Sequence, residues 1–258
     1  MMKLTADYHT HTVYSDGKST FLENFRRAKE LGLAEIGCTE HGFSHLFRGL
    51  KRRELAQYIR ELRAAEKEVG IRALLGMESN IRGITGLCDL TERDCEVFDL
   101  YVVGIHVLVR YEKLFDSKLG LGSYLRSQLH IRPSKSLVRY TTKSYINSIE
   151  RNPIDIVAHL NYGCFADPVE VAKCCRDYGT YLEISSKKPH LSDEDLAKVA
   201  ETGVRFVINS DAHSADRIGD LKLAMEQVER VGIPLDRIDN LNGKLPKFRL
   251  QQWKIEHM

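Results

Sequence analysis

The sequence predicts an α/β fold, a barrel-like domain in which parallel strands alternate with helices. Three observations indicate it. Short apolar runs alternate with helical patterns along the whole chain. Residues 99–106 and 205–211 are almost continuously apolar, which is typical of parallel strands buried on both faces. The length of 258 residues is ordinary for a single α/β barrel. We therefore expect one domain over residues 1–258.

Start and stop signals separate the expected helices from the expected strands. Thr20 and Glu23 form the pattern of a capping box, and Gly32 ends the first helix. Ser192 and Asp195 mark the start of a later helix in the same way. The strands are expected at residues 4–9, 35–39, 73–78, 100–105, 154–159, 180–184 and 204–209.

Composition and charge exclude several classes of protein. The net charge is +2 and the pI is about 8.2, below the range of most nucleic-acid-binding domains. No run approaches the roughly 20 apolar residues that span a bilayer, and the first residues lack the apolar core of a signal peptide. We expect a cytoplasmic protein. The six cysteines form no Cys-x-x-Cys pair, so free, buried thiols are expected.

Two segments fall outside the regular alternation of strands and helices. Residues 107–140 hold seven Lys or Arg and only two acidic residues, and they are longer than a typical strand-to-helix connection. This basic insertion is interpreted as a helical excursion, a lid or a solvated loop. The C-terminal extension at residues 233–258 carries Phe248 and Trp253. It is expected to pack on the barrel, cover its bottom or meet a partner.

Polar side chains follow six of the seven expected strands. His9 and His11 come first, and residues two apart in a strand share a face. The C-terminal ends of barrel strands surround one mouth, where active sites lie. The complete set comprises His9, His11, Asp16, His41, Glu78, His106, His159, Asp211 and His213.

Nine such groups packed together would be poorly satisfied without cations. Imidazole and carboxylate suit zinc, manganese or iron. The number of groups exceeds what one tetrahedral ion with an open position needs. The sequence therefore predicts two or three divalent transition-metal ions at the mouth of the barrel.

The motifs "HTHTVYSDG", "TEHG", "GMES", "GIH", "AHL" and "SDAH", in this order, resemble the PHP (polymerase and histidinol phosphatase) family of metal-dependent phosphoesterases. The resemblance runs from about residue 7 to residue 215. It implies a distorted (β/α)7 TIM-like barrel with a trinuclear site at the C-terminal face. The family often has His where this chain has Asp16.

The resemblance also implies how the ligands are shared among three ions. His9, His11, Glu78 and Asp211 would hold one ion. Glu78 would bridge to a second ion, held with His106 and His159. The third would be held by Asp16, His41 and His213. Glu78, Asp211 and His106 are the residues expected to be catalytic.

We expect a hydrolase that cleaves a small phosphate monoester with metal-activated water. Glu40, beside His41, is a candidate proton shuttle. A histidinol phosphatase is one member of this class, although the loop after His159 lacks the basic residue that the resemblance implies for it. The candidate substrate-binding residues are Arg48, Arg110, Lys187 and Arg217.

Three alternatives stay open. A phosphodiesterase or nuclease would use the basic insertion to grip a nucleic-acid backbone, but aromatic residues there are sparse. An amidohydrolase-type barrel also opens with His-x-His, but it usually bridges its metals with a modified Lys, where this chain has Glu78. A non-catalytic, metal-bound regulatory module is the third. The oligomeric state cannot be read from the sequence.

Overall fold

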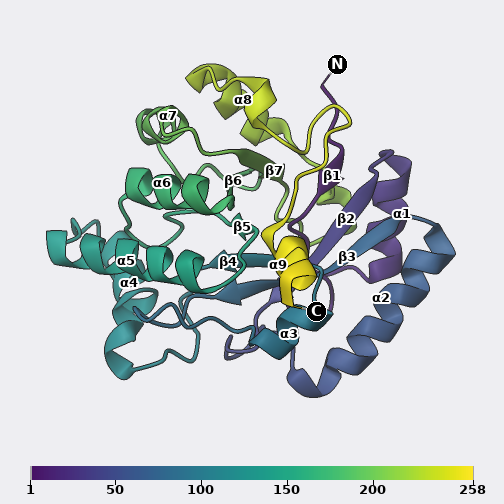
Figure 1. Cartoon of the computed structure of the whole chain (residues 1–258), viewed down its shortest axis with the longest axis horizontal. Helices are drawn as coiled ribbons and strands as arrows, with labels where there is room; N and C mark the ends of the chain where they lie inside the picture. Colours follow the sequence, from purple (N-terminus) through teal and green to yellow (C-terminus); the bar gives the residue numbers. More distant parts are fainter. Residues whose placement is uncertain (1, 258) are drawn as a thin grey trace.

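Seven parallel strands form a single sheet in the computed structural model, which describes residues 2–257. Each strand pairs with the next strand along the chain, and helices lie around the outside (Figure 1). This nearly closed barrel confirms the expected distorted (β/α)7 fold. The strands are β1 (Ala6–Asp7), β2 (Glu35–His41), β3 (Arg72–Asn80), β4 (Leu100–Gly104), β5 (Ile156–Val157), β6 (Tyr181–Ser185) and β7 (Phe206–Asn209).

The helices that follow Thr20 and Ser192 begin where the sequence signals place them. The Thr20 side chain accepts from the Glu23 amide and Glu23 caps Thr20 in return, and Ser192 accepts from the Asp195 amide. The helices are α1 (Phe21–Glu30), α2 (Leu55–Val69), α3 (Glu92–Val97), α4 (Leu121–Gln128), α5 (Lys135–Arg151), α6 (Pro168–Tyr178), α7 (Asp193–Glu201), α8 (Lys222–Val231) and α9 (Arg249–His257), with short 3-10 turns η1 (Arg52–Glu54), η2 (Leu114–Lys118), η3 (Ala215–Arg217) and η4 (Leu235–Arg237).

Strands β1 and β5 are shorter than the expected ranges 4–9 and 154–159. In both, the chain leaves the hydrogen-bonded ladder before it reaches its histidines. Residue 10 regains a single bridge to Ala212, and His159 has a positive φ of 30°. The departure from regular strand geometry lets side chains near these ends turn toward the barrel mouth.

The C-terminal extension closes the barrel between β1 and β7. The Asn240 side chain donates to the carbonyls of Ala6 and Ile208 and accepts from the Ile208 amide. Asn240 is fully buried. The seam between the first and last strands is therefore filled by a side chain rather than by a continuous ladder.

Two apolar clusters lie on opposite faces of the strands. The larger one packs the outer strand faces against the helices. The smaller one fills the barrel interior with alternate strand residues, including Tyr8, Leu100 and Ile156. Phe248 of the extension belongs to this inner cluster, with its ring 5.0 Å from that of Tyr8 and at right angles to it. The extension thus plugs the bottom of the barrel.

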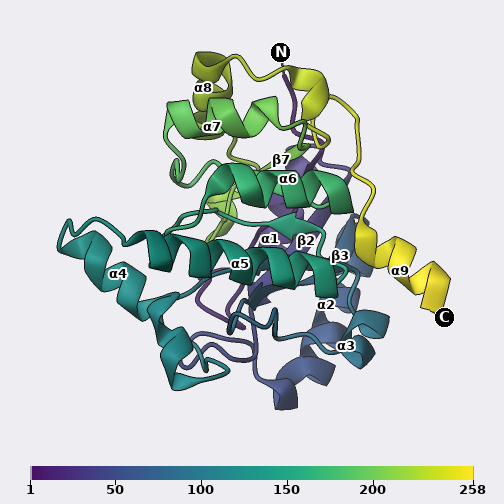
Figure 2. The same ribbon diagram turned by 60° about the vertical axis from the view of Figure 1, so that its left-hand side comes forward.

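The basic insertion is helical, containing η2, α4 and the start of α5. Figure 2 shows α4 and α9 on opposite sides of the molecule. All six cysteines are buried and unbonded, as expected. Among residues 2–257, none of the helices has the length and apolar content needed to cross a bilayer.

Candidate metal centre

Strand periodicity sets the level of the polar residues inside the barrel. Along β3, residues 74, 76 and 78 face inward, so Glu78 lies above the apolar layer that contains Leu74. Glu183 on β6 lies above Tyr181 by the same rule. Gly104 on β4 leaves space, because a Cβ there would lie 2.7 Å from the His159 ring. The polar layer therefore begins one step above the core.

Irregular backbone positions the remaining residues. The rings of His9 and His11 lie 5.2 Å apart just beyond β1, side by side as the sequence predicted. His159 and Asp211 adopt positive φ values of 30° and 47°, which are uncommon for residues other than glycine. Such strain collects at functional sites.

All nine predicted ligands come together at the carboxyl ends of the strands. Glu78 is central, with its oxygens 3.5 Å from His9 Nε2 and 2.8 Å from His41 Nδ1. Their ligand atoms fall into four overlapping groups, each within 4.8 Å: His11, Asp16, His41 and His213; His9, His11 and Glu78; His9, His159 and Asp211; and His41, Glu78 and His106.

Many polar atoms in this cluster are buried without a hydrogen bond of regular geometry, and several of them face one another at ion-pair distance. Within residues 2–257, six of the thirteen such side-chain atoms belong to the predicted ligands: His9 Nε2, His11 Nε2, Asp16 Oδ1, His41 Nδ1, Glu78 Oε2 and His106 Nε2. Buried polar atoms are normally satisfied. These nitrogen and oxygen atoms converge without regular hydrogen bonds, an arrangement that fits bound metal ions.

The electrostatics point the same way. Burial acts to raise the pKa of Glu78, but the nearby histidines, His106 foremost, hold it well below its usual range. Burial acts to lower the pKa of His41, but Glu78 and Asp16 raise it to about 10. The pKa of His11 is lowered to about 3, mainly by burial. In this cluster, protons on histidines balance the carboxylates where a metal ion would do so.

The sequence model of the family described as "PHP domain" matches residues 7–231. The chain belongs to the PHP domain family. It is 30% identical to a probable phosphatase of Thermoanaerobacter sp. strain X514, over 96% of this chain and 95% of that protein.

Two solved structures share the fold. A Listeria monocytogenes protein superposes with a TM-score of 0.60 at 14% identity, over 83% of this chain and 97% of that chain. A Lactococcus lactis histidinol phosphate phosphatase, solved with zinc, L-histidinol and phosphate, gives a TM-score of 0.57 at 18% identity, over 89% and 94%.

In this PHP domain chain, the predicted ligands are oriented by side chains that the sequence analysis missed. Glu183 accepts from His9 Nδ1 at 2.8 Å and from the His159 amide at 2.9 Å. Asn80 Oδ1 lies 2.7 Å from His106 Nδ1. The available signal was an acidic or amide residue within an otherwise apolar strand. Outer partners of this kind fix the tautomer and orientation of metal-binding histidines.

Glu40, the candidate proton shuttle, lies beside the loop that follows β1. It is fully buried and accepts from the Thr12 amide at 3.0 Å and from the hydroxyls of Thr12 and Ser15. The Ser15 hydroxyl in turn lies 3.4 Å from His11 Nδ1. Glu40 therefore holds the loop after β1, and Ser15 links it to His11.

The four candidate substrate-binding cations divide into two pairs. Lys187 Nζ lies 3.0 Å from Asp211 Oδ2, and Arg48 lies 3.1 Å from Asp16 Oδ2, so both meet the cluster. Arg217 pairs with Asp220 at 2.6 Å, and Arg110 lines a separate cavity.

Two further histidines, which the sequence analysis did not predict, lie beside the cluster of nine ligands. The His45 ring stacks on His41 at 5.1 Å, and the His190 ring lies 5.7 Å from that of His159. Both follow strands, in the loops after β2 and β6, which was the only signal for them.

Proposed function

We propose that this chain hydrolyses a phosphate monoester, using two or three divalent transition-metal ions (zinc, manganese or iron) held by the nine clustered side chains. One observation carries the proposal. Side chains from six strand ends converge, and six of their buried nitrogen and oxygen atoms form no hydrogen bond of regular geometry. Membership of the PHP domain family and the similarity to a probable phosphatase support this chemistry.

The proposed ligands divide as the motifs imply. His9, His11, Glu78 and Asp211 hold one ion, and Glu78 shares a second with His106 and His159. The third is held by Asp16, His41 and His213. Glu78 belongs to two groups of atoms within 4.8 Å of one another, one with His9 and His11 and one with His41 and His106, which supports a position of Glu78 between neighbouring ions.

Ions bound there would lower the pKa of a water molecule and neutralise charge on the phosphate. The chain's own contribution is orientation and charge. Glu78, Asp211 and His106 are the proposed catalytic residues, and each belongs to one or more of the clustered ligand groups. Lys187 and Arg48 supply cationic donors at its edge, suited to phosphate oxygens.

The first test is release of p-nitrophenol from p-nitrophenyl phosphate by the Mn²⁺-loaded protein, with and without chelator. Turnover that chelator abolishes is expected. Asp211→Asn should lower turnover by at least about 10–100-fold, which is the effect of removing an outer partner of a metal ligand. Asp236→Asn, an exposed carboxylate on η4, is the matched control and should keep wild-type turnover.

The outcome also selects among substrate classes. Near-wild-type turnover by Asp211→Asn would reject the ligand assignment. If monoesters fail in protein that contains metal, turnover of oligonucleotides with steep salt dependence would favour the phosphodiesterase alternative. Histidinol phosphate belongs in the monoester screen alongside sugar and nucleotide phosphates.

A further inference from the structure

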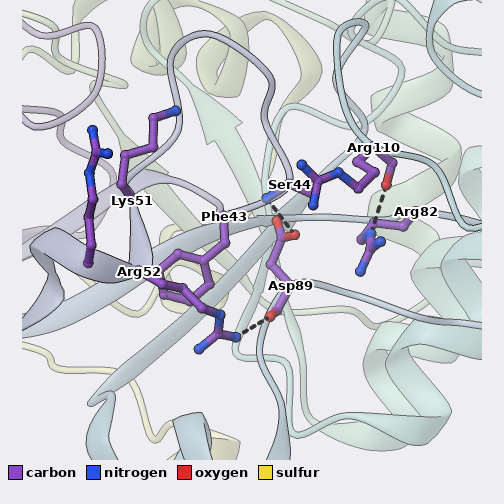
Figure 3. A pocket seen from close by; sticks show the side chains of 8 residues that line it. Phe43, Ser44, Lys51, Arg52, Arg82, Asp89 and Arg110 are labelled. Atoms are coloured by element: carbon purple, nitrogen blue, oxygen red, sulfur yellow. Dashed lines mark hydrogen bonds between the residues drawn. The ribbon is translucent and has the colours of Figure 1, made fainter.

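A cavity of about 560 Å³ lies apart from the metal cluster and contains none of the nine proposed ligands (Figure 3). It opens between the loops that follow β2, β3 and β4. Five cationic side chains and a single carboxylate line it, together with Phe43 and Ser44. The charged residues are Lys51, Arg52, Arg53, Arg82, Arg110 and Asp89.

A two-stranded ribbon separates this cavity from the metal cluster. His45 and Val109 form an antiparallel bridge, and the Arg110 amide donates to the Ser44 carbonyl at 2.8 Å. Neighbouring residues of an extended ribbon point to opposite faces. His45 stacks on His41 of the cluster, so Ser44 and Arg110 face away from it, into the cavity.

The single carboxylate is already satisfied by neutral donors. Asp89 accepts from the Ser44 amide at 3.0 Å, from the Asn80 amide at 2.8 Å and from the Asn80 side chain at 2.6 Å. Arg52 donates to the Asp89 backbone carbonyl, and its charge is paired with Asp94. Within residues 2–257, the Asp89 carboxylate forms no ion pair with the arginines around it.

The other cations have no fixed counter-charge. Within residues 2–257, Lys51, Arg82 and Arg110 form no ion pair, and Arg53 only approaches Glu54 at 3.6 Å. Arg82 is held in place because its Nε donates to the Arg110 carbonyl at 2.8 Å. Its terminal nitrogens stay free for a ligand (Figure 3).

We propose that this cavity is a binding site for an anion with two phosphate groups, separate from the metal centre. Guanidinium groups bind phosphate oxygens through paired, charge-assisted hydrogen bonds. Cations from the β2 loop on one wall and from the β3 and β4 loops on the other can engage two phosphates at once. Neither the metal ions nor the proposed hydrolysis is needed for this binding.

The site is also connected to the metal centre by hydrogen bonds. The Ser44 amide and Asn80 both bind Asp89, and Asn80 orients the proposed ligand His106.

The test is calorimetric titration of inorganic pyrophosphate into the Asp211→Asn protein, which lacks one of the nine proposed metal ligands. Lys51→Ala/Arg53→Ala and Arg82→Ala/Arg110→Ala, each added to that background, remove the two walls separately. Each pair of substitutions should weaken the affinity for pyrophosphate at least about tenfold. Arg60→Ala/Arg151→Ala, exposed arginines on α2 and α5, is the charge-matched control and should not.

The remaining outcomes are decisive as well. Affinity in the background protein should fall as salt rises, and inorganic phosphate should bind more weakly than pyrophosphate. Unchanged affinity in both wall variants, or an equal loss in the control, would overturn the proposed site. Since the readout is binding, an absence of phosphatase activity would leave this result intact.

Discussion

At the scale of single residues, the proposed metal centre depends on side chains that are not among the nine proposed ligands. Glu183 is fully buried against His9, and it also accepts from Asn209 Nδ2 at 2.9 Å. Burial acts to raise the pKa of Glu183, but His9 foremost lowers it. Glu183 therefore remains a carboxylate and keeps the Nε2 atom of His9 directed at the cluster.

Glu183→Gln should weaken metal binding about 10–100-fold, because an amide keeps one acceptor and loses the charge that orients His9. The measurement is metal affinity by competition with a chromophoric chelator, with the unfolding midpoint recorded alongside. Glu229→Gln, an exposed position on α8, is the matched control. Wild-type affinity in the Glu183 variant would contradict this orienting role.

At the scale of elements, the C-terminal extension is part of the barrel. Asn240 fills the seam between β1 and β7, and Phe248 fills the bottom of the interior. The Leu250 amide donates to Asp155 Oδ1 at 2.9 Å, which ties α9 to the start of β5. In Figure 1, α9 lies in front of the sheet, near α3.

Phe248→Ala should lower the free energy of unfolding by about 3–5 kcal/mol, because it empties the bottom of the barrel next to Tyr8. Denaturant-induced unfolding measures the change. Ile255→Ala on the same extension removes a side chain that is 76% exposed and should change stability by less than about 0.5 kcal/mol. If Phe248→Ala lowered the free energy of unfolding no more than Ile255→Ala does, Phe248 would contribute little to the stability of the barrel.

At the scale of the whole molecule, the barrel gathers carboxylates and histidines from six strands into one buried cluster. Burial lowers the pKa of His11, whereas carboxylates raise the pKa of His9 well above normal despite its burial. The metal-free cluster is therefore balanced by protons. Metal binding must displace some of them, which couples metal affinity to pH.

Metal affinity should consequently rise with pH from about pH 6 to pH 9, by about tenfold per pH unit for each proton released. The sign follows from His41, whose pKa of about 10 keeps it protonated across this range until a metal ion replaces the proton. Titrations in buffers with different ionisation enthalpies count the released protons. Affinity that does not change with pH would contradict the proton-balanced cluster.

The sequence alone determined the repeating strands and helices and the nine residues at the strand ends. Both follow from local rules: the period of apolar residues sets the element, and the carboxyl ends of successive parallel strands surround one mouth of the barrel. Thr20 and Ser192 show the same locality, since a cap depends only on residues three positions away.

Only the tertiary structure decided which side chains contact one another across long stretches of the sequence. Glu183 lies 174 residues from His9, and Asn240 lies 234 residues from Ala6, so no local pattern links them. Arg48 and Arg110 both follow strands, yet one meets the cluster and the other faces a separate cavity. The direction of a long side chain on a loop is set by what packs around it, and that packing exists only once the barrel has closed.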